Sequence, residues 1–134
     1  MEHLRNLFIR PPRYQYKTSD LGPNRFCVRG ITVDRFDVQL KNKKDLTLQG
    51  SHFFPQVGKE KLPCMLYLHG NASCRLDALK MLDMLILYKI SLFAFDFAGC
   101  GLSEGEYITL GPHEVHDIEV VVEHLLKTNK VANI

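Results

Sequence analysis

The sequence of 134 residues contains no tryptophan and only four cysteines, Cys27, Cys64, Cys74 and Cys100. These cysteines show neither the CxxC spacing of a metal site nor the density of a disulfide scaffold. We therefore expect reduced thiols in a cytoplasmic protein and no bound metal.

Long apolar runs and a strong charge of one sign are also missing. The most apolar stretch, MLDMLILYKISLFAFDF, is interrupted by Asp83, Lys89 and Asp96, so no segment predicts a membrane span. The start, MEHLRNLFIRPP, lacks the basic-then-apolar order of a secretory signal. The net charge is only +2, and no basic block is interleaved with aromatic residues, which argues against a nucleic-acid partner.

Hydrophobic residues make up 46% of the sequence, which is typical of a globular domain. Residues 1–30 contain Pro11, Pro12 and Pro23 and little periodicity, so we expect an extended N-terminal arm laid over a domain of residues 31–134. Apolar and polar residues alternate in RFDVQL and again in DLTLQG, on either side of KNKK. This alternation predicts a β-hairpin with KNKK as its solvated turn.

Two near-continuous apolar runs, LPCMLYLHG and ISLFAFDFAG, predict strands covered on both faces, as in a parallel sheet. The segment between them predicts a helix with Asn71 or Ser73 as its N-cap and an apolar face at positions 76, 79, 82 and 86. Together these pieces predict a right-handed βαβ unit, and the fold class is α/β.

A second helix is predicted to begin at Pro112, with an apolar stripe made of Val115, Ile118, Val122 and Leu125. The other face carries metal-binding residue types at helical spacing: His113, His116, Asp117 and His124. No second element supplies further ligands. We therefore expect this face to be solvated, with neither a metal nor another cofactor.

The segment GLSEG, residues 101–105, matches the GxSxG pattern of a nucleophile elbow, which places its serine between a strand and a helix. Here the apolar strand ends several residues before Ser103, and the following EYITLGP does not favour a helix. We therefore expect Ser103 to be a structural residue in a turn. An alternative is nucleotide binding at GCG, but the third glycine of GxGxxG comes one position late and opens no helix.

The loop HGNAS, residues 69–73, follows a buried strand and leads into a helix. Such a loop directs backbone N–H groups into one small volume, where they can stabilise an oxyanion. A tight turn in which His69 is only hydrogen-bonded in place is the alternative.

The two motifs PCMLYLHGNAS and LFAFDFAGCGLSEGEY, in this order and separated by one amphipathic helix, resemble the α/β-hydrolase superfamily, in particular its serine aminopeptidase-like and lipid or thioester hydrolase branch. The resemblance covers residues 31–134. It implies an antiparallel hairpin that leads into a mostly parallel sheet flanked by helices. It also implies that Asn71 supplies a backbone oxyanion donor, supported by His69 and Gly70. The structural turn would consist of Asp96, Gly99, Gly101 and Ser103.

In that superfamily the nucleophile follows the next strand, for which VANI looks like the beginning. The resemblance therefore implies an N-terminal portion of a serine hydrolase acting on a small-molecule or peptide ester, thioester or amide, inactive alone. It also implies that the strand at 64–69 has an open edge, through which the chain could self-associate. The competing hypothesis is a non-catalytic interaction protein that binds partners through this edge.

Overall fold

The computed structural model describes residues 1–10 and 12–134. Its elements, including two 3-10 helices labelled η, are α1 (Glu2–Ile9), η1 (Thr18–Leu21), β1 (Arg25–Val28), β2 (Ile31–Lys41), β3 (Thr47–Pro55), β4 (Leu62–Tyr67), η2 (Arg75–Met81), α2 (Leu82–Leu87), β5 (Ser91–Phe95), α3 (Glu114–Lys127) and β6 (Val131–Asn133).

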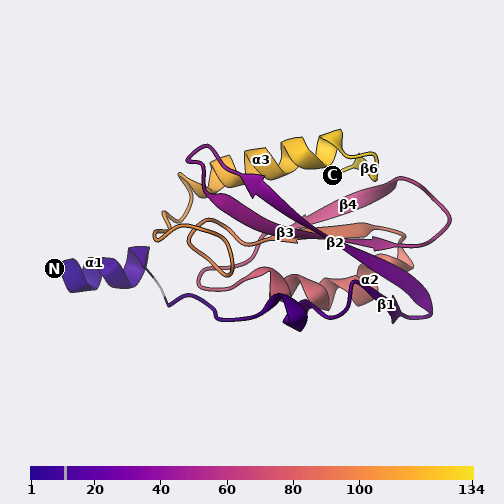
Figure 1. Ribbon diagram of the computed structural model, residues 1–134, viewed down its shortest axis with the longest axis horizontal. Helices are drawn as coiled ribbons and strands as arrows, with labels where there is room; N and C mark the ends of the chain where they lie inside the picture. The colour runs from indigo at the N-terminus through magenta and orange to yellow at the C-terminus, as the bar shows by residue number, and fades with distance from the viewer. Residues whose placement is uncertain (11) are drawn as a thin grey trace.

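A six-stranded sheet in the order β1-β2-β3-β5-β4-β6 forms the centre of the molecule (Figure 1). The predicted hairpin is confirmed, because β2 and β3 pair from Val33↔Pro55 to Lys41↔Thr47. The Asn42 side chain closes its turn by accepting hydrogen bonds from the backbone N–H groups of Lys44 and Leu46. β4 pairs in parallel with β5 and with β6, whereas β1, β2, β3 and β5 pair antiparallel. The sheet is therefore mixed.

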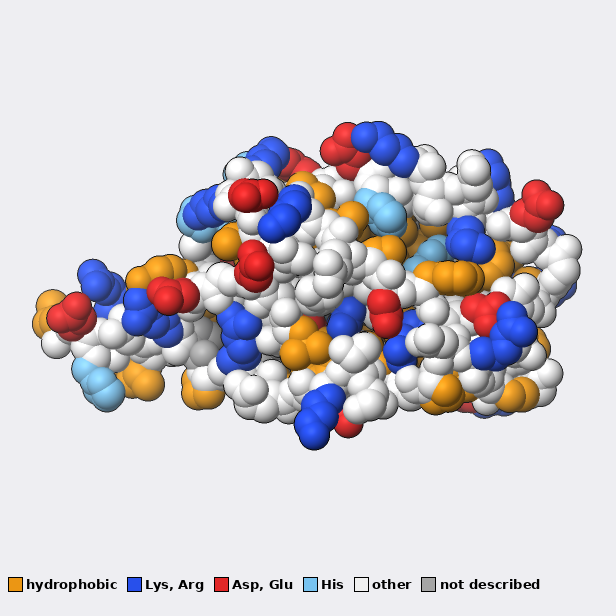
Figure 2. Space-filling model, viewed as in Figure 1, with side chains coloured by type: hydrophobic (Ala, Val, Ile, Leu, Met, Phe, Trp, Pro, Cys, Tyr) orange, Lys and Arg blue, Asp and Glu red, His pale blue; other side chains and the backbone are white. Residues whose placement is uncertain are grey.

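The first thirty residues are more structured than an extended arm. They contain α1, η1 and β1, and β1 pairs with β2 as the edge strand of the sheet. Helix α1 projects beyond the body of the protein at one end (Figures 1 and 2). Tyr16 and Leu21 reach back into the core, so this segment contributes to packing.

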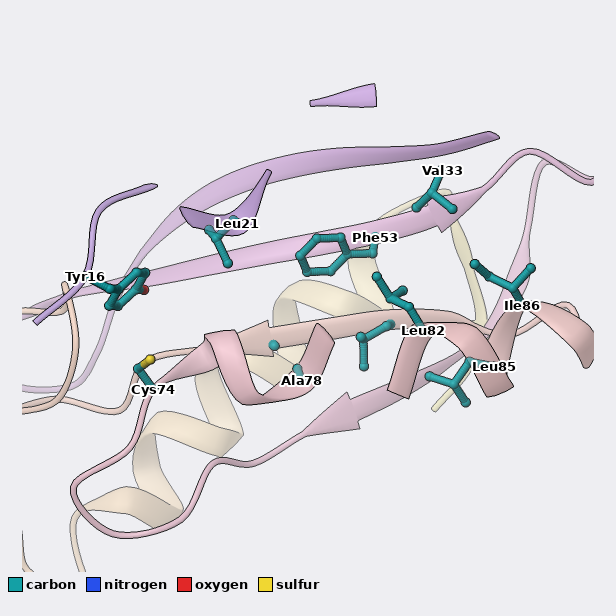
Figure 3. Close-up of a cluster of buried hydrophobic side chains, with 11 residues drawn as sticks. Tyr16, Leu21, Val33, Phe53, Cys74, Ala78, Leu82, Leu85 and Ile86 are labelled. Atoms are coloured by element: carbon teal, nitrogen blue, oxygen red, sulfur yellow. The ribbon is translucent and has the colours of Figure 1, made fainter. Parts of the chain in front are cut away.

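The helices cover the two faces of the sheet. η2 and α2 pack on one face, where Phe53, Ala78, Leu82 and Leu85 are fully or almost fully buried (Figure 3). α3 lies over the other face, on a cluster that includes Leu48, Phe93, Phe95, Val121 and Leu125. None of the described helices is both long and apolar enough to cross a membrane.

Both predicted helices differ in detail from the expectation. The first begins as the 3-10 helix η2 at Arg75, with Cys74 as its N-cap, and becomes α-helical only at Leu82. Neither predicted cap acts as one, and the Ser73 hydroxyl instead donates to the Asp77 carboxylate. The polar contacts of this loop, described below, take the place of an ordinary cap.

The second helix, α3, begins at Glu114 rather than Pro112, and its buried face is rotated from the predicted stripe. Val115 is half exposed, whereas Asp117, Val121 and Leu125 are buried. The reason is Asp117, whose carboxylate accepts hydrogen bonds from the Ala98 backbone N–H at 2.9 Å and from the Asn42 side chain at 2.9 Å. These bonds turn the Asp117 carboxylate toward the protein interior, whereas the apolar pattern of the helix predicts that it faces solvent.

Candidate active site

Two loops meet at the carboxyl ends of β4 and β5, which are parallel neighbours and therefore end at the same edge of the sheet. The first loop, residues 68–74, contains HGN. The second, residues 96–113, contains the Asp96 to Ser103 turn. Their contacts create the candidate site.

His69 links the two loops through its ring. Nε2 accepts a hydrogen bond from the Phe97 backbone N–H at 3.1 Å, which requires this nitrogen to be unprotonated. Nδ1 then carries the proton and donates it to the Gly70 carbonyl oxygen at 2.8 Å. The ring is buried and packs edge-on against Phe97, and these contacts hold His69 in one orientation. Both of its nitrogens are occupied, which leaves His69 to position the loop.

Asp96 is completely buried and joins three parts of the chain. Its carboxylate accepts hydrogen bonds from the backbone N–H of Arg75 at 2.7 Å, from that of Leu102 at 2.9 Å and from the Tyr16 hydroxyl. The buried Arg75 guanidinium lies 3.8 Å from the same carboxylate. Asp96 therefore fixes the start of η2, the second loop and the N-terminal segment relative to one another.

The Arg75 guanidinium also donates hydrogen bonds to two neutral hydroxyl groups. Its Nε donates to the Tyr16 hydroxyl at 2.7 Å and its Nη1 donates to the Ser51 hydroxyl at 3.1 Å. A buried ion pair is favourable only when such additional hydrogen bonds satisfy it. Burial and the hydrogen bond to Asp96 both raise the pKa of Tyr16, so its hydroxyl remains a proton donor.

The glycines of the second loop are required by close approaches. Gly99 has φ +82°, and a Cβ there would lie 2.7 Å from the Tyr107 carbonyl oxygen. Gly101 has φ +48°, and a Cβ there would overlap the Asp96 carboxylate. The spacing of Asp96, Gly99 and Gly101 thus reflects how tightly the loop wraps around one carboxylate.

Ser103 is buried and faces the sheet. Its hydroxyl donates to the Asp96 carbonyl oxygen at 2.6 Å and accepts from the Gln49 backbone N–H at 2.8 Å. No helix begins near it, since α3 starts only at Glu114. Ser103 therefore joins the loop to β3 and does not line the pocket described next.

A pocket of about 200 Å³ lies between the two loops and is lined by His69, Gly70, Asn71, Phe97, Cys100, Ile108, Leu110, Gly111 and Glu114. Asn71 follows directly on the locked His69 and Gly70. Among the described residues, no backbone carbonyl accepts a hydrogen bond from the Asn71 N–H. The pocket thus combines an apolar wall with a free backbone donor.

Besides His69, two titratable groups border this pocket, and neither suits proton transfer at neutral pH. Burial, with the neighbouring charge of Asp96, raises the pKa of the Cys100 thiol to about 11, so it is not a thiolate nucleophile. Burial alone would raise the pKa of Glu114. Hydrogen bonds from the Thr109 hydroxyl and from the backbone N–H groups of Thr109 and Gly111 outweigh burial and lower that pKa to about 2. Glu114 is therefore an anion that holds the loop to α3.

Three residues of this arrangement were not predicted from the sequence: Tyr16, Arg75 and Arg13. Arg13 reaches the second loop and donates to the carbonyl oxygens of Ser103, at 2.7 Å, and of Gly105. No local pattern identifies these residues, because each acts on a segment far away in the sequence. By contrast, His113, His116 and His124 do not converge, and no metal-binding group of His, Cys, Asp or Glu occurs in the part of the chain that the structure describes.

No protein-family model and no curated protein matches the sequence. Solved structures do: the esterase Pf2001 of Pyrococcus furiosus superposes with a TM-score of 0.66 at 25% identity, over 90% of this chain and 45% of that one. The α/β hydrolase GrgF of a Penicillium species matches with a TM-score of 0.57 at 20% identity, over 72% of this chain and 34% of that one.

The chain has an α/β-hydrolase fold. A third structure, Est1E of Butyrivibrio proteoclasticus with bound ferulic acid, matches with a TM-score of 0.63 at 19% identity, over 72% of this chain and 41% of that one. This chain therefore spans less than half the length of these α/β-hydrolase structures. In the sheet, β4 lies between β5 and β6.

Proposed function

We propose that this chain forms the oxyanion-stabilising side of a serine-hydrolase active site that cleaves an ester, thioester or amide of a small molecule or peptide. The serine aminopeptidase-like branch is the part of the superfamily that the two motifs favour. Esterases among the similar structures support hydrolysis of an acyl bond.

One observation carries the proposal: the Asn71 backbone N–H, without a backbone acceptor among the described residues, borders a pocket at the carboxyl end of β4. Acyl transfer concentrates negative charge on one oxygen of a tetrahedral intermediate, and a preorganised N–H stabilises that charge. His69 preorganises the loop at no further cost during the reaction, because both of its hydrogen bonds already exist.

The remaining catalytic groups lie elsewhere in this proposal. The Ser103 hydroxyl is buried and makes two hydrogen bonds, and both ring nitrogens of His69 are already hydrogen-bonded. Cys100 is a neutral thiol. We propose that the nucleophile follows the strand that begins as β6, and that the acid and histidine follow later. The 134 residues alone are then inactive.

The first test is the transcript or genomic sequence downstream of Ile134. An in-frame GxSxG within about ten residues supports the hydrolase proposal. A stop codon at that point contradicts it and favours an interaction protein. A fluorophosphonate probe applied to the 134-residue chain should label nothing, and labelling of Ser103 would overturn its structural role.

A longer protein that includes the proposed nucleophile, acid and histidine allows a sharper test of the oxyanion donor. Asn71→Pro removes the backbone N–H, and we expect kcat to fall by about 10² or more while the fold persists by circular dichroism. Asn71→Ala retains the N–H and is the matched control, with kcat close to that of the parent. Equal effects of the two substitutions would show that the side chain, not the N–H, matters.

A second candidate function is binding of another copy through the sheet edge. β6 pairs with β4 only at Leu62 and Pro63, so residues 64–67 have no neighbour on that side among the described strands. Open strand edges pair readily with other chains.

A further inference from the structure

Helix α1 carries an apolar face that the rest of the described protein leaves exposed. None of its residues is buried. Leu4, Leu7 and Phe8 follow at intervals of three and four residues, share one side of the helix and are 60%, 56% and 64% exposed. On another side, half-buried Ile9 faces the protein, where its carbonyl accepts a hydrogen bond from the Ile108 N–H at 2.9 Å.

An isolated helix of eight residues is unstable in water, because nucleation is unfavourable and few hydrogen bonds repay it. Such a helix needs a surface against which its apolar face can pack. The contact through Ile9 leaves the Leu4, Leu7 and Phe8 face without one. A further surface packed against this face would stabilise the helix.

The charge of the N-terminal segment indicates which kind of surface could cover the Leu4, Leu7 and Phe8 face. The first 17 residues contain four basic side chains, Arg5, Arg10, Arg13 and Lys17, and one acidic side chain, Glu2. The other 117 residues contain thirteen basic and fourteen acidic side chains. The basic excess of the sequence thus lies in this N-terminal segment, and Figure 2 shows basic and hydrophobic side chains together on the projecting end.

The segment after α1 is attached to the loop of the candidate site. The Arg10 guanidinium stacks 4.4 Å from the centre of the Tyr107 ring and lies 3.5 Å from the Glu106 carboxylate. Arg13 binds carbonyl oxygens of the same loop, and Ile108 lines the pocket. Helix α1 is therefore held at the end of the molecule where this pocket lies.

We propose that α1 is a membrane-surface element that docks the protein on an anionic bilayer. The Leu4, Leu7 and Phe8 side chains enter the boundary of the acyl chains, and the exposed Arg5 side chain on the same helix binds lipid phosphates. A helix about 12 Å long presents far fewer than the 20–30 residues per partner of a standard protein interface. A bilayer needs no shape complementarity, which favours it over a protein partner. This inference is independent of the proposed hydrolase function.

A single tryptophan tests the contact directly, because the chain has none of its own. In Phe8→Trp, we expect the emission to shift to shorter wavelength on addition of phosphatidylserine and phosphatidylcholine vesicles. Tyr88→Trp is the matched control, since Tyr88 is exposed at the end of α2 and should show no shift. The absence of a shift in Phe8→Trp would overturn the proposal, as would equal shifts in the two variants.

Vesicle sedimentation of the 134-residue chain separates the apolar from the ionic contribution. The triple variant Leu4→Ser, Leu7→Ser, Phe8→Ser should bind anionic vesicles at least about tenfold more weakly, whereas Leu87→Ser, also at an exposed leucine, should bind as the parent does. Binding should weaken in high salt and with phosphatidylcholine alone. If the triple variant instead abolishes self-association in solution without any change in vesicle binding, a second copy covers α1 and the membrane proposal is wrong.

Discussion

Asp96 is the residue on which the loops of the candidate site depend most. It is buried, charged and bonded to Tyr16, Arg75 and Leu102, so the loop after β5 wraps around it without space for a side chain at Gly101. Removing one partner from such a buried charge leaves the other uncompensated. The glycine is therefore as important to the loop as the carboxylate itself.

We expect Gly101→Ala to destabilise the protein by several kcal/mol, since the new Cβ overlaps the Asp96 carboxylate in addition to adopting a left-handed φ. Gly58→Ala is the matched control: φ there is +77°, and nothing lies within 4 Å of the new Cβ. It should lose only about 1–2 kcal/mol. Urea unfolding measures both, and equal losses would show that backbone conformation alone accounts for the effect.

At the scale of elements, α3 is positioned by two carboxylates as well as by its buried apolar residues. Asp117 bonds to Ala98 and Asn42, and Glu114 bonds to Thr109 and Gly111 in the loop that precedes the helix. These contacts set both the start of the helix and its rotation. Leu110 and Gly111 line the pocket, so the hydrogen bonds that the Glu114 carboxylate accepts from this loop also hold the pocket wall in place.

This dependence predicts a change of stability with pH. The pKa of Glu114 is about 2 in the folded protein, below its ordinary value of about 4.5, so its contribution is present above pH 4.5 and is lost as the pH falls toward 2. Glu114→Gln should destabilise the protein by about 1–3 kcal/mol at pH 7, and the difference from the parent should shrink below pH 4.5.

Urea unfolding at pH 7, 4 and 3 measures this difference. Glu123→Gln, in an exposed pair with Lys127, is the control and should leave the free energy of unfolding nearly unchanged, because solvent screens exposed ion pairs. A difference for Glu114→Gln that stays constant with pH would show that its carboxylate contributes by packing, not by charge.

For the molecule as a whole, the mixed sheet ends on a β4 edge that β6 covers only in part. Figure 1 shows β6 as a short strand at the margin of the sheet, beyond the end of α3. An edge of this kind, with half-buried Met65, Leu66 and Tyr67, favours pairing between copies.

We therefore predict concentration-dependent self-association of the 134-residue chain, measured by size-exclusion chromatography with light scattering. Leu68→Lys, at an exposed position beside this edge, should reduce the association, because lysine opposes strand pairing. Leu87→Lys, at a similarly exposed position on α2, should not. A monomer at high concentration would contradict the prediction.

Sequence periodicity alone determined the hairpin and the two apolar strands, because burial of β5 and alternation in β2 leave a direct record in residue types. It also located the loop of His69 and Asn71. It could not locate β1, α1 or the rotation of α3, since these depend on partners distant in the chain.

Only the tertiary structure decided that Tyr16 and Arg75 share the Asp96 carboxylate, that Arg13 binds the second loop and that Asp117 points inward. Each of these is a polar group that takes its place by satisfying a buried partner, and hydrogen bonds of that kind carry no periodicity. The apolar pattern specifies which surfaces are buried. The pairing of buried polar groups then determines how the loops of the candidate site are held.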